Sequence, residues 1–323
     1  MNKKFWAGKN VLITGCAGFL GSNLTKALIS SGANVFGLDI RIKRRDTILT
    51  PDDYKRITVI KGSVVNYKLV ESIIRKNKVN IVFHLAAEAI VGKCHDNPLR
   101  AFSTNIMGTW NILEACRNAK NIEAIIVASS DKAYGAHKKL PYTENAPLQG
   151  NHPYDVSKGC ADLIANTYAH TYGLPVCVTR CGNIFGPGDF NFSRLVPDAV
   201  ICVLTGKKLL IRSDGKFTRD YVFVEDIVNG YILLAERTRK LNLAGESFNF
   251  SCERPLTVIE LVKMISKAAG RPADYEILNQ AEYEIRHQYL SSRKARAKLN
   301  WKPKFSVLTG LTKTINAYSE GIK

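Results

Sequence analysis

The chain has 323 residues, 46% of them hydrophobic and 23% charged, which is an ordinary balance for a globular protein. This length can bury a large core and suits two lobes rather than many domains. No apolar run reaches membrane-spanning length, and residues 1–4 do not begin a secretory signal, so we expect a cytoplasmic protein without a membrane partner.

The net charge is +18, from 46 Lys and Arg against 28 Asp and Glu. Nucleic-acid binding is one interpretation, and a Lys-rich solvated surface with a few phosphate-binding cations is the other. We favour the second and expect no nucleic-acid partner, because the basic residues are spread out and no nucleic-acid-binding motif accompanies them. The eight cysteines lack metal-ligand spacing, which predicts reduced thiols and no metal site.

The first elements predict a βαβ unit. Residues 10–14 form a short apolar strand, residues 15–21 a glycine-rich turn, residues 22–31 a helix and residues 34–39 a second strand. Gly15, Gly18 and Gly21 would let the backbone approach a diphosphate, whose charge then lies at the N-terminus of the helix. This spacing departs from the commoner G-x-G-x-x-G, but its position between strand and helix makes it a specific signal.

Asp39 ends the second strand, where a carboxylate accepts hydrogen bonds from the adenosine ribose and repels a 2′-phosphate. We therefore expect NAD. Arg41, Lys43, Arg44 and Arg45 keep NADP open, because an arginine can receive that phosphate.

The alternation of strands and helices continues along the chain. Strands are predicted over residues 57–60, 80–87, 123–129 and 176–180, and helices over residues 67–77, 101–118 and 154–172. This pattern predicts an α/β fold with a Rossmann-type doubly wound parallel sheet, whose ligands bind at the carboxyl ends of the strands. We expect residues 1–182 to form the NAD-binding domain, with residues 219–250 returning to it. Residues 183–323 should mainly form a smaller C-terminal α/β lobe that binds the substrate.

Several motifs occur in order along nearly the whole chain. They are the glycine turn, His84-Leu85-Ala86-Ala87, Asn105-x-x-Gly108-Thr109, Ser129-Ser130, Tyr154-x-x-x-Lys158, the stretch Gly182–Gly188, and Arg219-Asp220-Tyr221. In these motifs the chain resembles the extended short-chain dehydrogenase/reductase family, which contains the nucleotide-sugar epimerases and dehydratases. The resemblance implies an NAD-dependent enzyme that acts on a nucleotide-diphosphate sugar. It also implies a homodimer formed through the helices near residues 101–118 and 154–172.

The resemblance also assigns residues to the cofactor. The expected contacts are Gly15, Gly18, Phe19, Leu20, Gly21, Asp39, Ile40, Arg41, Ser63, Val64, Leu85, Ala86, Ala87, Asn105, Tyr154 and Lys158. Ser63 stands where the family usually has an acid near the adenine.

Oxidation of a sugar hydroxyl needs a base for the hydroxyl proton. A tyrosine has a pKa of about 10, so lowering it to about 7 requires roughly 4 kcal/mol of preferential stabilisation of the phenolate. Lys158 lies one helical turn from Tyr154 and supplies positive charge, and Ser130 would hydrogen-bond the reacting oxygen.

Asp131 and Lys132 follow Ser130 directly and indicate more than oxidation. Once C4 of a hexose is a ketone, a base can remove the C5 proton and an acid can protonate O6 as it leaves as water. The Asp-Lys pair resembles the CDP-glucose 4,6-dehydratases, and we expect Asp131 as the acid and Lys132, as a neutral amine, as the base. The alternative for Lys132 is an ion pair with a carboxylate at the rim of the pocket. An epimerase, the runner-up function, needs only Ser130, Tyr154 and Lys158.

The substrate's nucleotide diphosphate should lie on the second lobe. Arg219 is the leading candidate, because a guanidinium matches phosphate oxygens, and a surface arginine paired with Asp220 or Glu225 is the alternative. The other expected substrate contacts are Glu88, Asn183, Arg194, Leu195 and Arg293. Arg219-Asp220-Tyr221 looks like the wider family, and Ser291 replaces a common acid, so a dTDP-, UDP- or GDP-sugar stays open beside CDP-glucose.

Overall fold

The fold was analysed in a computed structural model, in which residues 2–42, 46–281 and 284–322 are described. A seven-stranded parallel sheet forms its centre, in the order β10-β6-β5-β4-β1-β2-β3. The strands are β1 (Asn10–Thr14), β2 (Asn34–Asp39), β3 (Ile57–Lys61), β4 (Ile81–His84), β5 (Ala124–Ala128), β6 (Val176–Cys181) and β10 (Ser247–Phe250). This order confirms the doubly wound Rossmann-type sheet.

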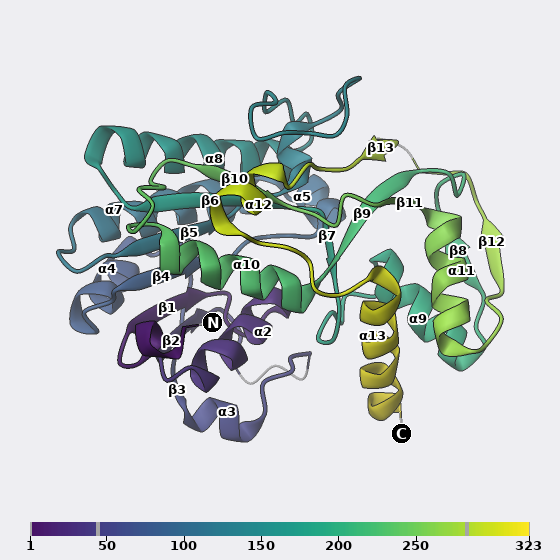
Figure 1. The fold of residues 1–323 in the computed structure, drawn as a ribbon, viewed down its shortest axis with the longest axis horizontal. Helices are drawn as coiled ribbons and strands as arrows, with labels where there is room; N and C mark the ends of the chain where they lie inside the picture. The colour runs from purple at the N-terminus through teal and green to yellow at the C-terminus, as the bar shows by residue number, and fades with distance from the viewer. Residues whose placement is uncertain (1, 43–45, 282–283, 323) are drawn as a thin grey trace.

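Helices cover both faces of the sheet (Figure 1). One face carries α2 (Phe19–Ser30) and α10 (Val224–Arg237), and the other carries α4 (Tyr67–Lys76), α7 (Gly108–Arg117) and α8 (Pro153–Tyr172). The strands bury side chains on both sides because successive residues point to opposite faces. In β1, Val11 and Ile13 join the core under α2 and α10, while Leu12 joins the core under α4 and α7.

The second lobe is built around a smaller sheet, drawn at the right of Figure 1. Strand β9 (Thr218–Phe223) pairs with β7 (Asn183–Phe185), β11 (Pro255–Thr257) and β13 (His287–Gln288), and β8 (Leu209–Ile211) pairs with β12 (Tyr275–Ile277). The helices of this region are α9 (Leu195–Thr205), α11 (Val258–Ala269), α12 (Arg293–Leu299) and α13 (Val307–Ile322). Within the stretch 219–250, α10 and β10 lie with the large sheet, whereas β9 belongs to the small one. The domain boundaries themselves stay a prediction.

Two predicted elements differ from the structure for physical reasons. The strand expected over residues 80–87 ends at His84, because the Thr14 hydroxyl accepts the N–H groups of Leu85 and Ala86, each at 3.1 Å, and draws the chain away from the ladder. The helix expected over residues 101–118 is interrupted. A π-helical turn over Ser103–Met107 separates α6 (Pro98–Phe102) from α7.

A buried ion pair fixes α8 against the sheet. Arg180 on β6 and Asp162 on α8 are both almost fully buried, and their closest atoms are 2.7 Å apart. Arg180 also donates to the Tyr134 hydroxyl at 2.8 Å, and that hydroxyl donates to Asn249 on β10 at 2.8 Å. Tyr134 ends η2 (Asp131–Tyr134), a single 3₁₀ turn, so this network anchors the turn that carries Asp131 and Lys132.

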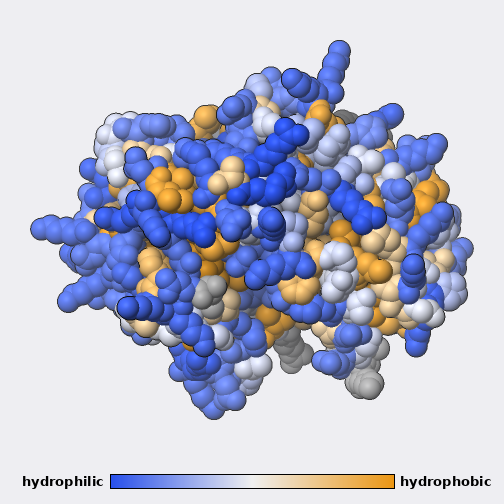
Figure 2. Space-filling model, viewed as in Figure 1, coloured by the Kyte–Doolittle hydropathy of each residue, from blue (hydrophilic) through white to orange (hydrophobic). Residues whose placement is uncertain are grey.

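Figure 2 shows a mainly hydrophilic face, with hydrophobic residues gathered most broadly over the right half of the view. None of the described helices combines the length and the apolarity that a bilayer crossing requires. All eight cysteines are free. The short helices not yet named are α1 (Lys3–Trp6), α3 (Pro51–Lys55) and α5 (Val91–Asp96).

Candidate active site

The glycine turn lies between the end of β1 and the start of α2. Gly15 has a φ of +71°, and a Cβ there would lie 3.1 Å from the backbone of Ala86. A Cβ on Gly21 would lie 2.0 Å from the Gly15 carbonyl oxygen, and one on Gly18 would lie 3.3 Å from the same atom. No side chain caps the first turn of α2, which begins Phe19-Leu20, so its N–H groups can receive an anionic ligand.

Asp39 lies at the end of β2 beside this turn. Its buried carboxylate accepts the N–H of Ala17 at 3.1 Å and the N–H of Arg41 at 3.0 Å. Ile40, which stands between Asp39 and Arg41 in the sequence, is half exposed. The residues present fit a dinucleotide: an open helix N-terminus for the diphosphate and a carboxylate for the ribose. Lys43, Arg44 and Arg45, which kept NADP open, lie outside the described residues.

The residues expected near the adenine and nicotinamide line the neighbouring strand ends. The Ser63 hydroxyl accepts the Val65 N–H at 3.2 Å, and Val64 is buried against Gly108. Leu85, Ala86 and Ala87 leave β4 as half-buried backbone next to Gly15.

Asn105 lies in the π-helical turn and ties three segments together. Its amide accepts the Glu88 N–H at 2.8 Å and donates to the Glu88 carbonyl at 3.0 Å and to the Ser157 hydroxyl at 2.9 Å. Asn105 therefore connects the chain after β4 to α8. The Glu88 carboxylate, expected at the substrate, pairs with Arg100 at 3.1 Å.

The predicted catalytic residues come together where β5 ends and α8 begins. Ser130 caps η2 by accepting the Lys132 N–H at 3.2 Å, and its hydroxyl donates to Asp131 Oδ1 at 3.1 Å. Lys158 Nζ donates to the Ala128 carbonyl at 2.8 Å and lies 6.0 Å from the centre of the Tyr154 ring. The five residues Ser130, Asp131, Lys132, Tyr154 and Lys158 thus form one cluster of charged and polar groups.

Burial shifts the pKa of several groups in this cluster. It raises the pKa of the Asp131 carboxyl, against the opposing charges of Lys132 and Arg219. It also raises the pKa of the Tyr154 phenol, although a hydrogen bond with Ser130 lowers it. The pKa of Lys158 falls to about 8, again because the group is desolvated. Asp131 is thereby disposed to carry a proton, and Tyr154 needs further positive charge to become a base near neutral pH.

His84 lies in the core and is not part of the catalytic cluster. Its ring lies 2.9 Å from the Thr14 hydroxyl and 3.1 Å from the Thr109 hydroxyl, and burial lowers its pKa to about 3. The ring is therefore neutral at physiological pH, and each of its nitrogens has a hydrogen-bond partner.

Arg219 is neither exposed nor paired with Asp220 or Glu225. Only 7% of it is exposed, and its guanidinium donates to the carbonyls of Thr218 and Arg286 and lies 3.3 Å from Glu284. Its positive charge lowers the pKa of Asp131, so Arg219 lies within electrostatic reach of the catalytic cluster. Asn183, on the strand paired with β9, hydrogen-bonds Tyr221.

The other two arginines lie elsewhere. Arg194 pairs with Asp189 at 2.5 Å and donates to the Ile184 carbonyl at 2.7 Å, and its guanidinium lies 6.0 Å from the Phe19 ring centre. It is therefore held beside the glycine turn, just before Leu195 begins α9. Arg293 is exposed on the first turn of α12.

Three buried polar side chains were not anticipated. Asp155 Oδ1, Asp220 Oδ1 and both amide atoms of Gln288 have no hydrogen-bond partner within the described part of the chain. Burial and the charge of Asp131 raise the pKa of Asp220 to about 7, and Gln288 pairs in register with Arg219. Most buried polar atoms in proteins have a hydrogen-bond partner, so these three side chains stand out. The sequence signal for Asp155 was its position directly after Tyr154.

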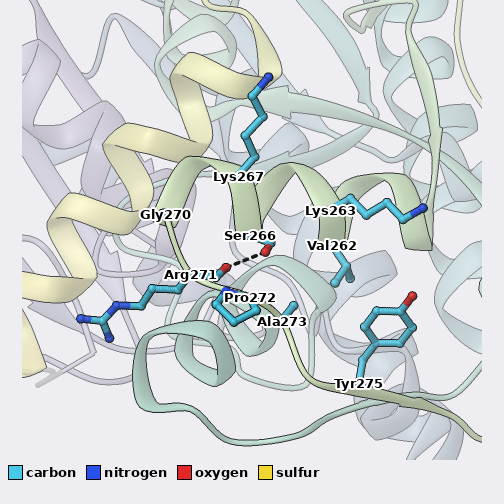
Figure 3. Close-up of a pocket in the computed structure, with 9 residues that line it drawn as sticks. All are labelled: Val262, Lys263, Ser266, Lys267, Gly270, Arg271, Pro272, Ala273 and Tyr275. Atoms are coloured by element: carbon cyan, nitrogen blue, oxygen red, sulfur yellow. Dashed lines mark hydrogen bonds between the residues drawn. The ribbon is translucent and has the colours of Figure 1, made fainter.

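A separate cavity of about 430 Å³ lies on α11 of the second lobe, and none of the expected site residues lines it (Figure 3). The side chains of Lys263, Lys267 and Arg271 point in different directions there, so they do not converge on an anion. Nor do His, Cys, Asp or Glu side chains gather in threes as a metal site, as far as the described residues extend.

Comparison with known proteins identifies the family to which the chain belongs. A family model described as GDP-mannose 4,6 dehydratase matches residues 12–314. The CDP-glucose 4,6-dehydratase of Salmonella typhimurium is 30% identical over 332 residues, covering 98% of this chain and 90% of the relative.

Two solved structures are similar to this chain in both sequence and fold. A dTDP-glucose 4,6-dehydratase from Bacillus anthracis in complex with NAD is 30% identical, with a TM-score of 0.86 and 97% of both chains covered. A UDP-glucose 4-epimerase from Thermotoga maritima with UDP-glucose is 28% identical, with a TM-score of 0.87, covering 97% of this chain and 100% of that one. These likenesses confirm the expected fold, the family resemblance and NAD as the cofactor of such enzymes, and they include both dehydratases and epimerases.

The cofactor cradle can be tested at Gly21. In Gly21→Ala the new methyl group meets the Gly15 carbonyl, so the turn must open, and we expect NAD affinity to fall by about tenfold or more. Isothermal titration with NAD measures this. Gly92→Ala is the matched control, because a Cβ there meets no atom within 4 Å. Equal NAD affinity in both variants would remove the glycine turn from cofactor binding.

Proposed function

The chain belongs to the GDP-mannose 4,6 dehydratase family, and from that premise we propose that it is an NAD-dependent nucleotide-sugar 4,6-dehydratase that converts CDP-glucose to CDP-4-keto-6-deoxyglucose. The observation that carries the proposal is the buried Asp131 carboxyl, which shares a hydrogen bond with Ser130 and has a raised pKa. The reaction of an epimerase does not require an acid of this kind beside the site of oxidation.

The first step is oxidation at C4. NAD, held by the glycine turn and Asp39, would supply the acceptor for the C4 hydride and the donor for its return to C6. Tyr154 takes the proton of the C4 hydroxyl, and Ser130 hydrogen-bonds the same oxygen. The positive charges of Lys158 and of the nicotinamide stabilise the phenolate, which offsets the effect of burial on the Tyr154 pKa. Lys158 would also hold the nicotinamide ribose.

The second step is loss of water across C5 and C6. The C4 ketone makes the C5 proton acidic, and Lys132 as a neutral amine removes it. Asp131 gives its proton to O6, which departs as water. The buried carboxyl suits this role, because desolvation favours its protonated form.

The substrate's diphosphate lies on the second lobe in this proposal. Arg219 supplies a guanidinium fork for the phosphate oxygens, which would replace Glu284 as its partner. CDP-glucose is proposed as substrate because the Asp131-Lys132 pair and the relative from Salmonella typhimurium both point to it. The runner-up is a 4-epimerase, supported by the similarity to the Thermotoga maritima enzyme.

A homodimer is proposed from exposed apolar side chains on neighbouring helices. Leu99 on α6, Trp110 on α7, and Leu163 and Tyr172 on α8 are 77%, 41%, 62% and 52% exposed. Helix α8 contacts both α6 and α7, so these exposed side chains lie on neighbouring helices. Apolar residues gathered in this way indicate an interface.

Product analysis tests the reaction. The protein is incubated with NAD and CDP-, dTDP-, UDP- or GDP-glucose in deuterated water, and the products are followed by NMR. We expect a 4-keto-6-deoxy sugar with deuterium at C5, formed fastest from CDP-glucose. A C4-inverted sugar without solvent deuterium would establish the epimerase instead.

Lys132→Met separates the two steps. The variant lacks the base for C5 but keeps Tyr154, Ser130 and Lys158, so water loss should stop while C4 oxidation leaves trapped NADH, visible by absorbance. Lys138→Met, at an exposed lysine of the following loop, is the control and should retain full turnover. Full dehydratase activity in Lys132→Met would show that Lys132 is not the base.

Leu163→Glu tests the dimer. A carboxylate in an apolar interface is costly to bury, so the variant should sediment as a monomer while the wild type sediments at twice the chain mass. Leu308→Glu, on α13 away from these helices, should not change the mass. A monomeric wild type, or an unchanged Leu163→Glu dimer, would contradict the proposed interface.

A further inference from the structure

The turn η2 carries Asp131 and Lys132, and its two ends are held by different contacts. Just before its first end, the Ser129 hydroxyl donates to the Lys158 carbonyl on α8 at 3.2 Å. At its last end, Tyr134 is fully buried and its hydroxyl is bonded to the large sheet. The acid and the base proposed for the loss of water therefore lie between two separate anchors.

The Tyr134 hydroxyl is tied to two strands of the large sheet. It accepts a hydrogen bond from Arg180 Nη1 on β6 at 2.8 Å and donates to Asn249 Oδ1 on β10, also at 2.8 Å. The Arg180 guanidinium lies 4.9 Å from the centre of the Tyr134 ring as well. Burial raises the pKa of Tyr134 to about 12, so the hydroxyl keeps its proton and both hydrogen bonds at neutral pH.

The two partners of this hydroxyl are themselves fixed. Arg180 pairs with Asp162 on α8 at 2.7 Å and donates to the Glu144 carbonyl at 3.1 Å. Asn249 donates its side-chain amide to the Tyr142 carbonyl at 3.1 Å, and its backbone N–H donates to the Glu144 carboxylate at 2.9 Å. Since neither partner is free to move, the phenol between them is held in one position.

Tyr134 is coupled closely to the backbone of Lys132. The N–H of Gly135, the residue after Tyr134, donates to the Lys132 carbonyl at 3.0 Å. A displacement of Tyr134 therefore moves the backbone from which Lys132 projects. Tyr154 and Lys158 are on α8 instead, which the ion pair to β6 and the contact before η2 hold without the phenol. Loosening the last end of η2 thus disturbs the pair for water loss and leaves the residues for oxidation in place.

We propose that Tyr134 is a positioning residue that holds η2 so that Asp131 and Lys132 reach C6 and C5 of the sugar, and that it serves the loss of water and not the oxidation at C4. This inference rests on the proposed 4,6-dehydratase function. Tyr134 is fully buried, so it acts through the turn and not by touching the substrate.

Tyr134→Phe tests this role, because it keeps the volume of the ring and removes only the anchoring hydroxyl. A small misplacement of reacting groups is costly, so water loss should slow about tenfold while C4 oxidation changes by less than about twofold. NADH should therefore accumulate during a single turnover of CDP-glucose. The measurement follows NADH by absorbance and the 4-keto-6-deoxy product in quenched samples of the same reaction.

Tyr231→Phe is the matched control. Tyr231 on α10 is also buried, and its hydroxyl accepts the Thr179 hydroxyl at 2.6 Å, away from η2. This variant loses a comparable buried hydrogen bond and should unfold at a lower temperature without accumulating NADH. If Tyr134→Phe behaves in the same way, with both steps slowed equally or neither slowed, Tyr134 contributes only to stability and the proposal is overturned.

Asn249→Ala breaks the same hydrogen bond from the other side and provides the second readout. It should also accumulate NADH, and the double variant should slow water loss no more than the stronger single variant, whereas multiplied effects would contradict a shared anchor. NAD titration and thermal unfolding show whether the variants are folded, and Asn249→Ala takes the place of Tyr134→Phe if the latter is not.

The two levels of the account fail differently. A wild type that yields only a C4 epimer would refute the dehydratase. A wild type that loses water, with a folded Tyr134→Phe variant that shows no excess NADH, would refute only the role of Tyr134.

Discussion

The electrostatic coupling between buried ionisable groups governs this site. Asp131, Tyr154, Asp155 and Lys158 lie in a small volume at the ends of β5 and the start of α8, and desolvation shifts the pKa of each toward its neutral form. Each charge added or removed there shifts the pKa values of the other groups. A bound cationic nicotinamide would therefore favour the Tyr154 phenolate.

This coupling depends on a rigid frame. The pair Arg180–Asp162 fixes α8 to β6, and Arg180 and Asn249 hold the Tyr134 hydroxyl at the end of η2. On the other side, Ser129 donates to the Lys158 carbonyl at 3.2 Å and Lys158 donates to the Ala128 carbonyl. The acid, the phenol and the lysine are thus held on two elements that cannot move apart without breaking buried polar contacts, which is how a site maintains its geometry before substrate arrives.

The parts of the site that the sequence predicted are those with local spacing. The glycine turn, Asp39 and the Tyr154–Lys158 pair each lie within one element or at one strand end, so periodicity and motif position them. The site features that the sequence did not predict depend on packing between distant segments. Arg219 pairs with Glu284, 65 residues away, rather than with its near neighbours, and Arg194 folds back to Phe19. The π-helical turn at Asn105 and the burial of Asp155 and Gln288 likewise follow from tertiary contacts that no single stretch of sequence contains.

The most direct test of this account is a structure of the protein with NAD and CDP-glucose bound. The account predicts that the Asp131 carboxyl lies about 3 Å from O6 and that Lys132 Nζ faces C5, while the Tyr154 hydroxyl lies within hydrogen-bond reach of O4. A complex in which Tyr154 meets O4 but Asp131 and Lys132 make no approach to C5 or C6 would contradict the dehydratase and leave an epimerase.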